Sequence, residues 1–307
     1  MLNCRMIKIP PYLKKGDTIG IVCPSGTLPA KKAATCISTL EAWGYKVKIG
    51  KTLGTQHHYF SATDKERAAD LQEMLDDKNV QAVLCGRGGY GMSRIIDILD
   101  FKKFKKHPKW VIGFSDITLL HNHFYQTLKT ASLHAPMAGA FNNGGSTNEW
   151  VLSLKHALQG KKANYKAAPH AHNIVGTATG KLVGGNLTLV AHAIGTVSGL
   201  QTKNAILFLE DIGEYKYNID RMMLQLKRSG MLKNLAGLIV GGFTQTKDSD
   251  PAFGATVYEI IEAAVAEYKY PVCYDFPVSH DKENYALKHG AIYTLQVTTK
   301  KVSLQEL

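Results

Sequence analysis

The sequence predicts an α/β protein, with a doubly wound parallel sheet in its N-terminal domain and a second α/β domain after it. Its 307 residues are enough for two domains, since a domain commonly has about 100–200 residues. Between Asp17 and about Thr130, short runs rich in β-branched residues alternate with amphipathic helical stretches. This alternation is typical of parallel βαβ units. We expect the first domain at 1–160, a linker at 161–180 and the second domain at 181–307.

Turn-forming residues divide the first half into strands and helices. The first apolar run, for example, stops at Pro24-Ser25-Gly26, and Gly44 closes the helix that follows. In a doubly wound sheet, functional groups gather beyond the carboxyl ends of the strands. The expected strands are Thr18–Cys23, Tyr45–Ile49, Val80–Leu84 and Trp110–Phe114, and the expected helices are Lys31–Trp43, Asp64–Leu75, Ser93–Leu99 and Ile117–Leu128.

The pattern is lost at about 159–180, which is polar, contains glycine and proline and has no sustained period. We therefore interpret this stretch as a linker. The domain beyond it becomes richer in strands towards its end. Its expected strands are Ala205–Leu209, Leu235–Phe243 and Ile292–Val297, and its expected helices are Leu187–Ile194, Ile219–Ser229 and Val257–Tyr268.

The composition is that of an ordinary globular protein, with 45% hydrophobic and 20% charged residues. The five cysteines are scattered without a CxxC pair, which argues against a disulfide framework and a zinc site. The formal charge of +12 comes from lysines spread along the chain, so we expect no nucleic-acid partner. No stretch has the apolar length of a signal peptide or a membrane span. We expect a cytoplasmic protein that needs no metal or cofactor.

A glycine-rich segment, Gly86-Arg-Gly-Gly-Tyr-Gly91, follows one expected strand and precedes a helix. It matches the GxGxxG pattern of dinucleotide binding. That interpretation is weakened because the segment lies on the third βα unit, whereas the fingerprint normally occupies the first. Its backbone N–H groups could instead contribute to an oxyanion hole, or the segment could be a purely structural turn. From the pattern alone, the three interpretations stay equally open.

Ser115 lies directly between an apolar strand and a helix, in the segment Gly-Phe-Ser-Asp. A serine in such a turn has an exposed hydroxyl, as in a nucleophile elbow, although only the first glycine of GxSxG is present. The backbone N–H of Asp116 would be one oxyanion donor, and the Gly88-Gly89 turn would supply a second. An ordinary N-cap serine is the alternative, and Ser25 is a rival nucleophile on the same grounds.

A serine nucleophile needs a base, and His280 is well placed to be one. It follows the strand-like run Val272–Val278 and begins a loop, so it is free to reach a neighbouring turn. A solvent-exposed histidine is the alternative. His121 and His123 lie two apart on a helix and face different sides, which makes the letters HNH a weak metal or nuclease signal.

Glu210 completes this set of candidate residues. It ends the strand AILFL, and a carboxylate at that edge could orient an imidazole and stabilise its protonated form. A surface carboxylate is the alternative, and Glu214 and Asp220 are competitors. The order Ser…Glu…His is one that a catalytic triad can take.

Seven blocks together resemble the LD-carboxypeptidase family, serine peptidases of the muramoyl-tetrapeptide carboxypeptidase type. They are GRGGYG, GFSDIT, HAPM, GGNLTL, FLEDIGEYKYNIDRMM, GLIVGGF and FPVSHDKEN, and they occur in family order from about Gly16 to Val297. The resemblance implies a flavodoxin-like N-terminal domain, a smaller β-rich C-terminal domain and a homodimer. It also implies that Ser115 is the nucleophile, with Glu210 and His280 as its partners.

By the same resemblance, the reaction is removal of the terminal D-alanine from a cytoplasmic murein tetrapeptide, in peptidoglycan recycling. The N–H groups of Asp116 and Gly89 would bind the oxyanion, and the substrate would contact Arg87, Gly88 and Tyr90. The chain departs from the pattern at Ser279, where many members have glycine before the histidine. A Cβ there could restrict the loop that carries the histidine.

Three other functions remain as alternatives. The first is the family's immunity branch, which cleaves peptidyl- or aminoacyl-nucleotide toxins. The second is a dinucleotide-binding protein that uses the segment 86–91. The third is a peptidoglycan-fragment sensor that binds the peptide without turnover.

Overall fold

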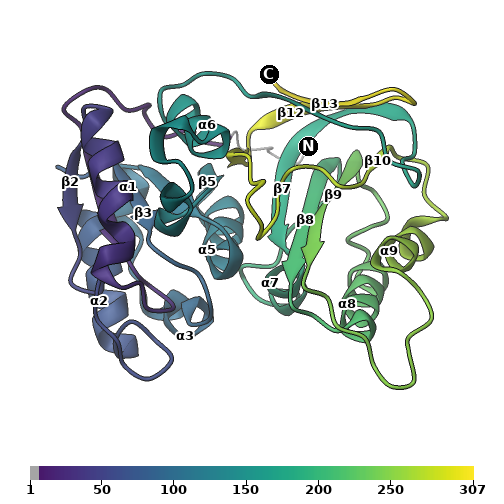
Figure 1. The fold of residues 1–307 in the computed structure, drawn as a ribbon, viewed down its shortest axis with the longest axis horizontal. Helices are drawn as coiled ribbons and strands as arrows, with labels where there is room; N and C mark the ends of the chain where they lie inside the picture. Colours follow the sequence, from purple (N-terminus) through teal and green to yellow (C-terminus); the bar gives the residue numbers. More distant parts are fainter. Residues whose placement is uncertain (1–6) are drawn as a thin grey trace. The chain divides into compact units, whose positions relative to one another are not determined.

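The computed structural model describes residues 7–307, so Cys4 lies outside the described part (Figure 1). The chain divides into two compact units. The first unit runs to Lys161 and takes in Tyr285–Lys288. The second contains Lys162–Asn284 and His289–Leu307. A short C-terminal segment thus belongs to the first unit.

The first unit is built on a six-stranded sheet in the order β11-β5-β4-β3-β1-β2. The pairs from β2 through β5 are all parallel. The order 2-1-3-4-5 among these five strands is the flavodoxin-like one, which confirms the predicted fold class. The strands are β1 (Thr18–Val22), β2 (Lys46–Ile49), β3 (Ala82–Cys85), β4 (Trp110–Gly113), β5 (Ser132–His134) and β11 (Leu287–His289).

The helices of this unit begin where the sequence offers caps and breakers. Thr63 and Glu66 form a reciprocal capping box at the start of α2, and Asn148 caps α6. The expected helix at 117–128 is instead divided into a 3-10 turn, α5 and a π-helical segment. The bounds are α1 (Ala30–Ala42), α2 (Asp64–Asp76), α3 (Met92–Ile95), α4 (Lys102–Lys106), α5 (Thr118–His123) and α6 (Glu149–Leu158).

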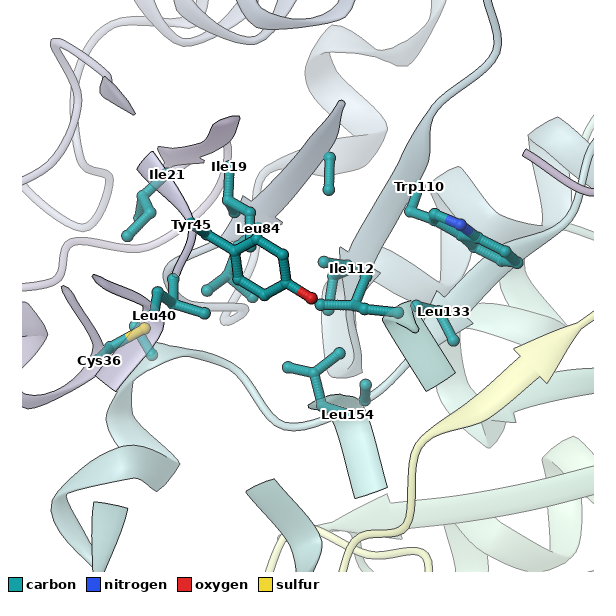
Figure 2. Close-up of a cluster of buried hydrophobic side chains, with 14 of the residues drawn as sticks. Ile19, Ile21, Cys36, Leu40, Tyr45, Leu84, Trp110, Ile112, Leu133 and Leu154 are labelled. Carbon is teal, nitrogen blue, oxygen red and sulfur yellow. The ribbon is translucent and has the colours of Figure 1, made fainter. Parts of the chain in front are cut away.

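One face of the sheet in the first unit carries a large cluster of its core residues. Ile19, Leu84 and Ile112 project from three adjacent parallel strands, and Leu40 of α1 and Leu154 of α6 pack over them (Figure 2). All five are at most 1% exposed. Burying a side chain of this size contributes about 1.5–3 kcal/mol. This packing holds the carboxyl ends of the strands, and the loops after them, in fixed positions.

The second unit contains a seven-stranded sheet in the order β10-β9-β8-β7-β12-β13-β6. The pairs from β7 to β10 are parallel, while β12, β13 and β6 add antiparallel pairs. The strands are β6 (Asn164–Ala167), β7 (Gly176–Asn186), β8 (Ala205–Ile212), β9 (Gly237–Thr244), β10 (Val272–Cys273), β12 (Ile292–Val297) and β13 (Val302–Glu306). The helices are α7 (Leu187–His192), α8 (Lys216–Arg228) and α9 (Val257–Val265).

The prediction of a linker at 161–180 is wrong. That stretch contains β6 and the first five residues of β7. Most residues of this stretch that lie in strands are polar or glycine. β6 pairs with β13, and the first residues of β7 pair with β12. The run Val272–Val278 is also less regular than expected, since only two of its residues form β10.

Three properties of the described part bear on the site. No helix within residues 7–307 is long and apolar enough to cross a bilayer. No group of three His, Cys, Asp or Glu side chains in that range could hold a metal ion. Cys23, Cys36, Cys85 and Cys273 are buried free thiols, and burial raises the pKa of each one.

Candidate active site

Ser115 sits in a strained turn at the carboxyl end of β4. Its φ is 63°, in the left-handed region that residues other than glycine rarely adopt. The turn Ser115–Ile117 leads directly into α5, and the serine is half-buried. Such a conformation costs on the order of 1–3 kcal/mol and is typical of functional sites. The local geometry therefore has the form of a nucleophile elbow.

The glycine-rich segment lies directly against this serine. A Cβ on Gly88 would be 2.8 Å from the Ser115 Cβ and 3.0 Å from its Oγ, so only glycine allows the approach. The Gly88 carbonyl accepts a hydrogen bond of 2.9 Å from the Gly26 N–H. Because the N–H and C=O of a trans peptide point in opposite directions, the Gly89 N–H points away from Gly26. Gly89 has a φ of 100°, which glycine alone adopts without strain.

Ser25, the alternative candidate for the nucleophile, is a buried hydrogen-bond donor. It is fully buried, and its Oγ donates to Asp116 Oδ2 at 2.5 Å. The same oxygen accepts from the backbone N–H of Met92 at 2.7 Å. Burial raises the pKa of Asp116, and the hydrogen bonds from Ser25 and Met92 act against that rise. A serine held in this way links two loops and is not exposed to a substrate.

The two predicted substrate-binding side chains in this segment are both exposed. Arg87 donates to the carbonyl of Thr27 at 3.0 Å. Tyr90 is 48% exposed, and its ring lies 6.5 Å from that of Tyr59, which is 62% exposed. Together they give the loop an aromatic, positively charged rim.

Glu210 and His280 meet inside the second unit. Glu210 Oε2 lies 2.5 Å from His280 Nδ1, and because a carboxylate accepts, Nδ1 carries the proton. Glu210 is fully buried within β8 rather than ending it, and it lies at a shift of the strand register between Leu209 and Asp211. The His280 side chain is 11% exposed. The structure thus brings these two predicted residues into contact.

The environment of His280 shifts its pKa upward. Burial lowers that pKa, but the Glu210 carboxylate raises it by its charge and its hydrogen bond. Asp211 and Asp281 add further negative charge, and the net direction is upward. An imidazole with this partner is a stronger base than an isolated one, and its protonated form is stabilised.

Two glycines that the sequence analysis did not single out let the His280 loop approach the sheet. A Cβ on Gly241 would be 2.2 Å from the Val278 carbonyl oxygen, and one on Gly242 would be 2.5 Å from the Ser279 Cβ. The Gly242 N–H also donates to the Val278 carbonyl at 2.9 Å. The signal was the paired glycine at the end of GLIVGGF, at the carboxyl edge of a strand.

Ser279 fits this loop without the restriction that its Cβ suggested. It is not among the residues with positive φ in the described part of the chain. Its Oγ donates to the Glu283 carbonyl at 3.0 Å and accepts from the Asp281 N–H at 3.0 Å. The side chain therefore ties the loop together, and the missing Cβ at Gly242 leaves room for it.

Glu214 and His121, two of the competing residues, have structural partners. Glu214 is held by Asn218 and Thr188 near the start of α8. Asp220 lies on α8 itself. His121 is fully buried, and its Nε2 donates to the Gly113 carbonyl at 2.9 Å. Burial lowers the pKa of His121 to about 4, so this ring is neutral and structural.

A cavity of about 540 Å³ lies beside the His280 loop in the second unit. Its volume is in the range of small-molecule sites. Gly242–Thr244, at the end of β9, form one wall, and Ser279 lies in the same lining. The charged residues that line it are Asp275, Asp281, Lys282 and Glu283.

Comparison with known proteins gives a consistent result. A model of the LD-carboxypeptidase N-terminal domain matches residues 19–135, and a model of the C-terminal domain matches residues 179–295. A Bacillus subtilis protein described as a probable murein peptide carboxypeptidase is 35% identical over 299 residues. That match covers 96% of this chain and 94% of the relative.

Solved structures resemble the whole chain as well. The muramoyltetrapeptide carboxypeptidase of Oxalobacter formigenes has a TM-score of 0.85 at 30% identity, covering 94% of this chain and 98% of that one. The microcin C7 self-immunity protein MccF, in complex with aspartyl sulfamoyl adenosine, has a TM-score of 0.85 at 21% identity. It covers 98% of this chain and 99% of its own, a likeness that shows the fold alone.

Proposed function

Because the chain belongs to the LD-carboxypeptidase family and is a serine-type carboxypeptidase, we propose that it releases the terminal D-alanine of murein tetrapeptides. The observation that carries this proposal is the 2.5 Å contact between Glu210 and His280. Glu210 orients the imidazole of His280 and makes it a stronger base. His280 lies on a loop of the second unit. The strained turn at Ser115, in the first unit, supports this serine as the nucleophile.

The reaction begins when Ser115 Oγ attacks the carbonyl carbon of the scissile amide. His280 Nε2 takes the hydroxyl proton, and Glu210 stabilises the resulting imidazolium through Nδ1. The carbonyl oxygen becomes an oxyanion, which the N–H groups of Gly89 and Asp116 bind. His280 then gives its proton to the nitrogen of the departing D-alanine. This leaves an acyl-enzyme on Ser115.

Water completes the cycle by the same steps in reverse. His280 takes a proton from the water as it attacks the ester, and Ser115 leaves with that proton. The products are D-alanine and a tripeptide with a free carboxylate. No oxidant, metal or organic cofactor enters this sequence of steps.

The lining of the two loops supports a charged peptide as substrate. The exposed Arg87 beside the glycine-rich segment suits a carboxylate. The cavity beside His280 offers both carboxylates and a lysine, which suits a side chain with an ammonium group, with or without a second carboxylate. Diaminopimelate and lysine at the third position both meet this description.

The proposal includes a place in the cell and an assembly state. We propose that the enzyme acts on cytoplasmic murein fragments during peptidoglycan recycling and works as a homodimer. Sedimentation of the purified chain tests the second statement, since a monomer at micromolar concentration would contradict it.

The test of the activity is D-alanine release from a purified murein tetrapeptide, comparing the native chain with Ser115→Ala. We expect release by the native chain and a loss of about 10³-fold or more in the variant. Ser146→Ala, at an exposed serine of the same unit, is the matched control and should keep full activity. Equal release by native and Ser115→Ala protein would refute the nucleophile.

The same assay separates the proposed substrate from the nucleotide conjugates. If the native chain releases no D-alanine, an aminoacyl-sulfamoyl adenosine is the next substrate to test, since MccF was solved with such a ligand. Hydrolysis of that compound alone would place the enzyme in the immunity branch. Binding of the tetrapeptide without cleavage of either compound would favour a sensor, and tight binding of NAD or FAD would favour a dinucleotide-binding protein.

A further inference from the structure

The three loops that follow β1, β3 and β4 are joined by one buried carboxylate. Asp116, in the third loop, is 1% exposed. Its Oδ2 accepts from Ser25 Oγ in the first loop at 2.5 Å and from the Met92 N–H, just after the second loop, at 2.7 Å. Two donors on one charged oxygen make two strong, directional bonds. The side chain therefore fixes both neighbouring loops relative to its own.

A second set of contacts connects the first loop to Ser115 through Gly88. The Gly26 N–H, next to Ser25, donates to the Gly88 carbonyl at 2.9 Å. The Gly88 Cα in turn packs against Ser115, where a Cβ would be only 2.8 Å from the serine Cβ. A shift of the first loop would thus move Gly88 and change the space above Ser115. It would also rotate the peptide that carries the Gly89 N–H.

We propose that the side chain of Asp116 is a positioning residue, which sets the glycine-rich segment at the correct distance from Ser115 Oγ. This inference rests on the proposed function, because it takes Ser115 as nucleophile and the Gly89 N–H as oxyanion donor. It assigns the Asp116 carboxylate a role separate from that of its own backbone N–H. Ser25 is the second positioning residue, because its hydroxyl donates to Asp116 and does not contact a substrate.

A buried arginine offsets part of the charge of Asp116. Arg67 is fully buried and donates to the carbonyls of Pro24 and Gly91, which lie on the same two loops. Its positive charge acts on Asp116 and lowers the pKa that burial raises. A buried carboxylate that lost a donor would be costly to keep, because its desolvation would no longer be offset. The loops are therefore held by a pair of opposite buried charges, each bonded to both of them.

The test uses Ser25→Ala and Asp116→Asn in the full chain, with a fluorophosphonate as probe. Ser25→Ala removes one bond and keeps the charge, whereas Asp116→Asn removes the charge and keeps the shape. Serine Oγ attacks the phosphorus of this probe and displaces fluoride, which leaves a phosphonylated serine. The rate depends on oxyanion stabilisation and therefore reports the geometry without any assumed peptide substrate. Asp97→Asn, at an exposed residue of the same unit, is the matched control.

We expect both variants to react fully at Ser115 but about 10–100-fold more slowly, since a misplaced oxyanion donor acts on the transition state. With the tetrapeptide, kcat per titrated serine should fall by a similar factor while KM changes by less than about threefold. Asp97→Asn should match the native rates. If Asp116→Asn does not fold, Ser25→Ala alone decides.

Native-like rates per reactive serine in Ser25→Ala and Asp116→Asn would overturn the proposal, even if both variants melt at lower temperature. That result would make the carboxylate a purely structural clamp. If native Ser115 is labelled but no D-alanine is released, the proposed substrate is wrong. The positioning role of Asp116 is then decided by the labelling rates of the variants alone. Absence of labelling at native Ser115 would overturn both.

Discussion

The contact between Gly242 and Ser279 allows the placement of His280 to be tested by a compensating pair of substitutions. Gly242→Ala would put a Cβ 2.5 Å from the Ser279 Cβ, whereas non-bonded carbons pack at about 3.5–4.0 Å. The strand and the loop would have to separate by about 1 Å, and His280 is the next residue. A misplacement of that size costs on the order of 10²-fold in rate. Overpacking of this kind also destabilises by about 1–3 kcal/mol.

Removing the opposing carbon should relieve the clash. We expect Ser279→Gly in the Gly242→Ala background to recover most of the lost rate. Recovery should be incomplete, because Ser279 Oγ also bonds to the Glu283 carbonyl and the Asp281 N–H. Gly139→Ala is the matched control, since an added Cβ there meets no atom within 4 Å.

Two measurements check this prediction. Proton NMR titration of the His280 ring should show its raised pKa falling towards the ordinary value of about 6.5 in Gly242→Ala, as the imidazole leaves Glu210. D-alanine release should fall in parallel, and both should recover in the double variant. The reasoning is refuted if Gly242→Ala leaves pKa and rate unchanged, or if the double variant is no better than Gly242→Ala.

Three further predictions concern titrating groups. Glu210→Gln should lower kcat by about 10³-fold or more. It should also move the acidic limb of kcat/KM to lower pH, because His280 acts as a neutral imidazole and its raised pKa would fall without the carboxylate. An acidic limb at the native pH would contradict the pairing of Glu210 with His280. The Glu210–His280 pair should also stabilise the native chain. This stabilisation is complete below the pKa that His280 has in the unfolded chain, and it is lost as pH rises through the higher pKa of the folded chain. The free energy of urea unfolding of Glu210→Gln should lack this dependence on pH. Burial lowers the pKa of Lys109 from 10.5 to about 8. Between these two pH values the unfolded chain binds more protons than the native chain, so the free energy of unfolding should rise with pH over this range. Lys109→Met should abolish that rise relative to the exposed control Lys106→Met. Equal slopes of the urea midpoint against pH in these two variants, between pH 8 and 10, would show that burial does not lower the pKa of Lys109.

Local patterns in the sequence were sufficient for β1 to β4 of the first sheet, whereas β5 and β11 were not expected. The strands β1, β3 and β4 are short apolar runs bounded by turn residues, and all three are buried, so their pattern is strong. Helices such as α2 carry a capping box that can be recognised within four residues. The expected bounds differ from the observed ones by only a few residues. In these elements, the information that specifies the structure lies close together in the chain.

The strands at 164–167 and 176–186 were missed because their pattern is not local. Most of their residues are polar or glycine, and their antiparallel partners β13 and β12 lie more than 100 residues further along the chain. Strand formation there depends on the neighbour across the sheet, and intrinsic β-propensity is too weak to reveal it. The absence of a hydrophobic period was therefore misread as the absence of structure.

The candidate catalytic residues could be named from motifs, but their contacts come from folding. Ser115 follows a strand and Glu210 and His280 lie in recognisable blocks, so residue type and order point to them. The contact between Glu210 and His280 joins residues 70 positions apart, and the bond from Ser25 to Asp116 spans 91. Both depend on glycines, at 241, 242 and 88, whose missing Cβ atoms permit close approach. Hydrogen bonds and steric fit act through distances in space, so a linear pattern identifies the chemical groups while the packed sheets and loops establish which of them meet.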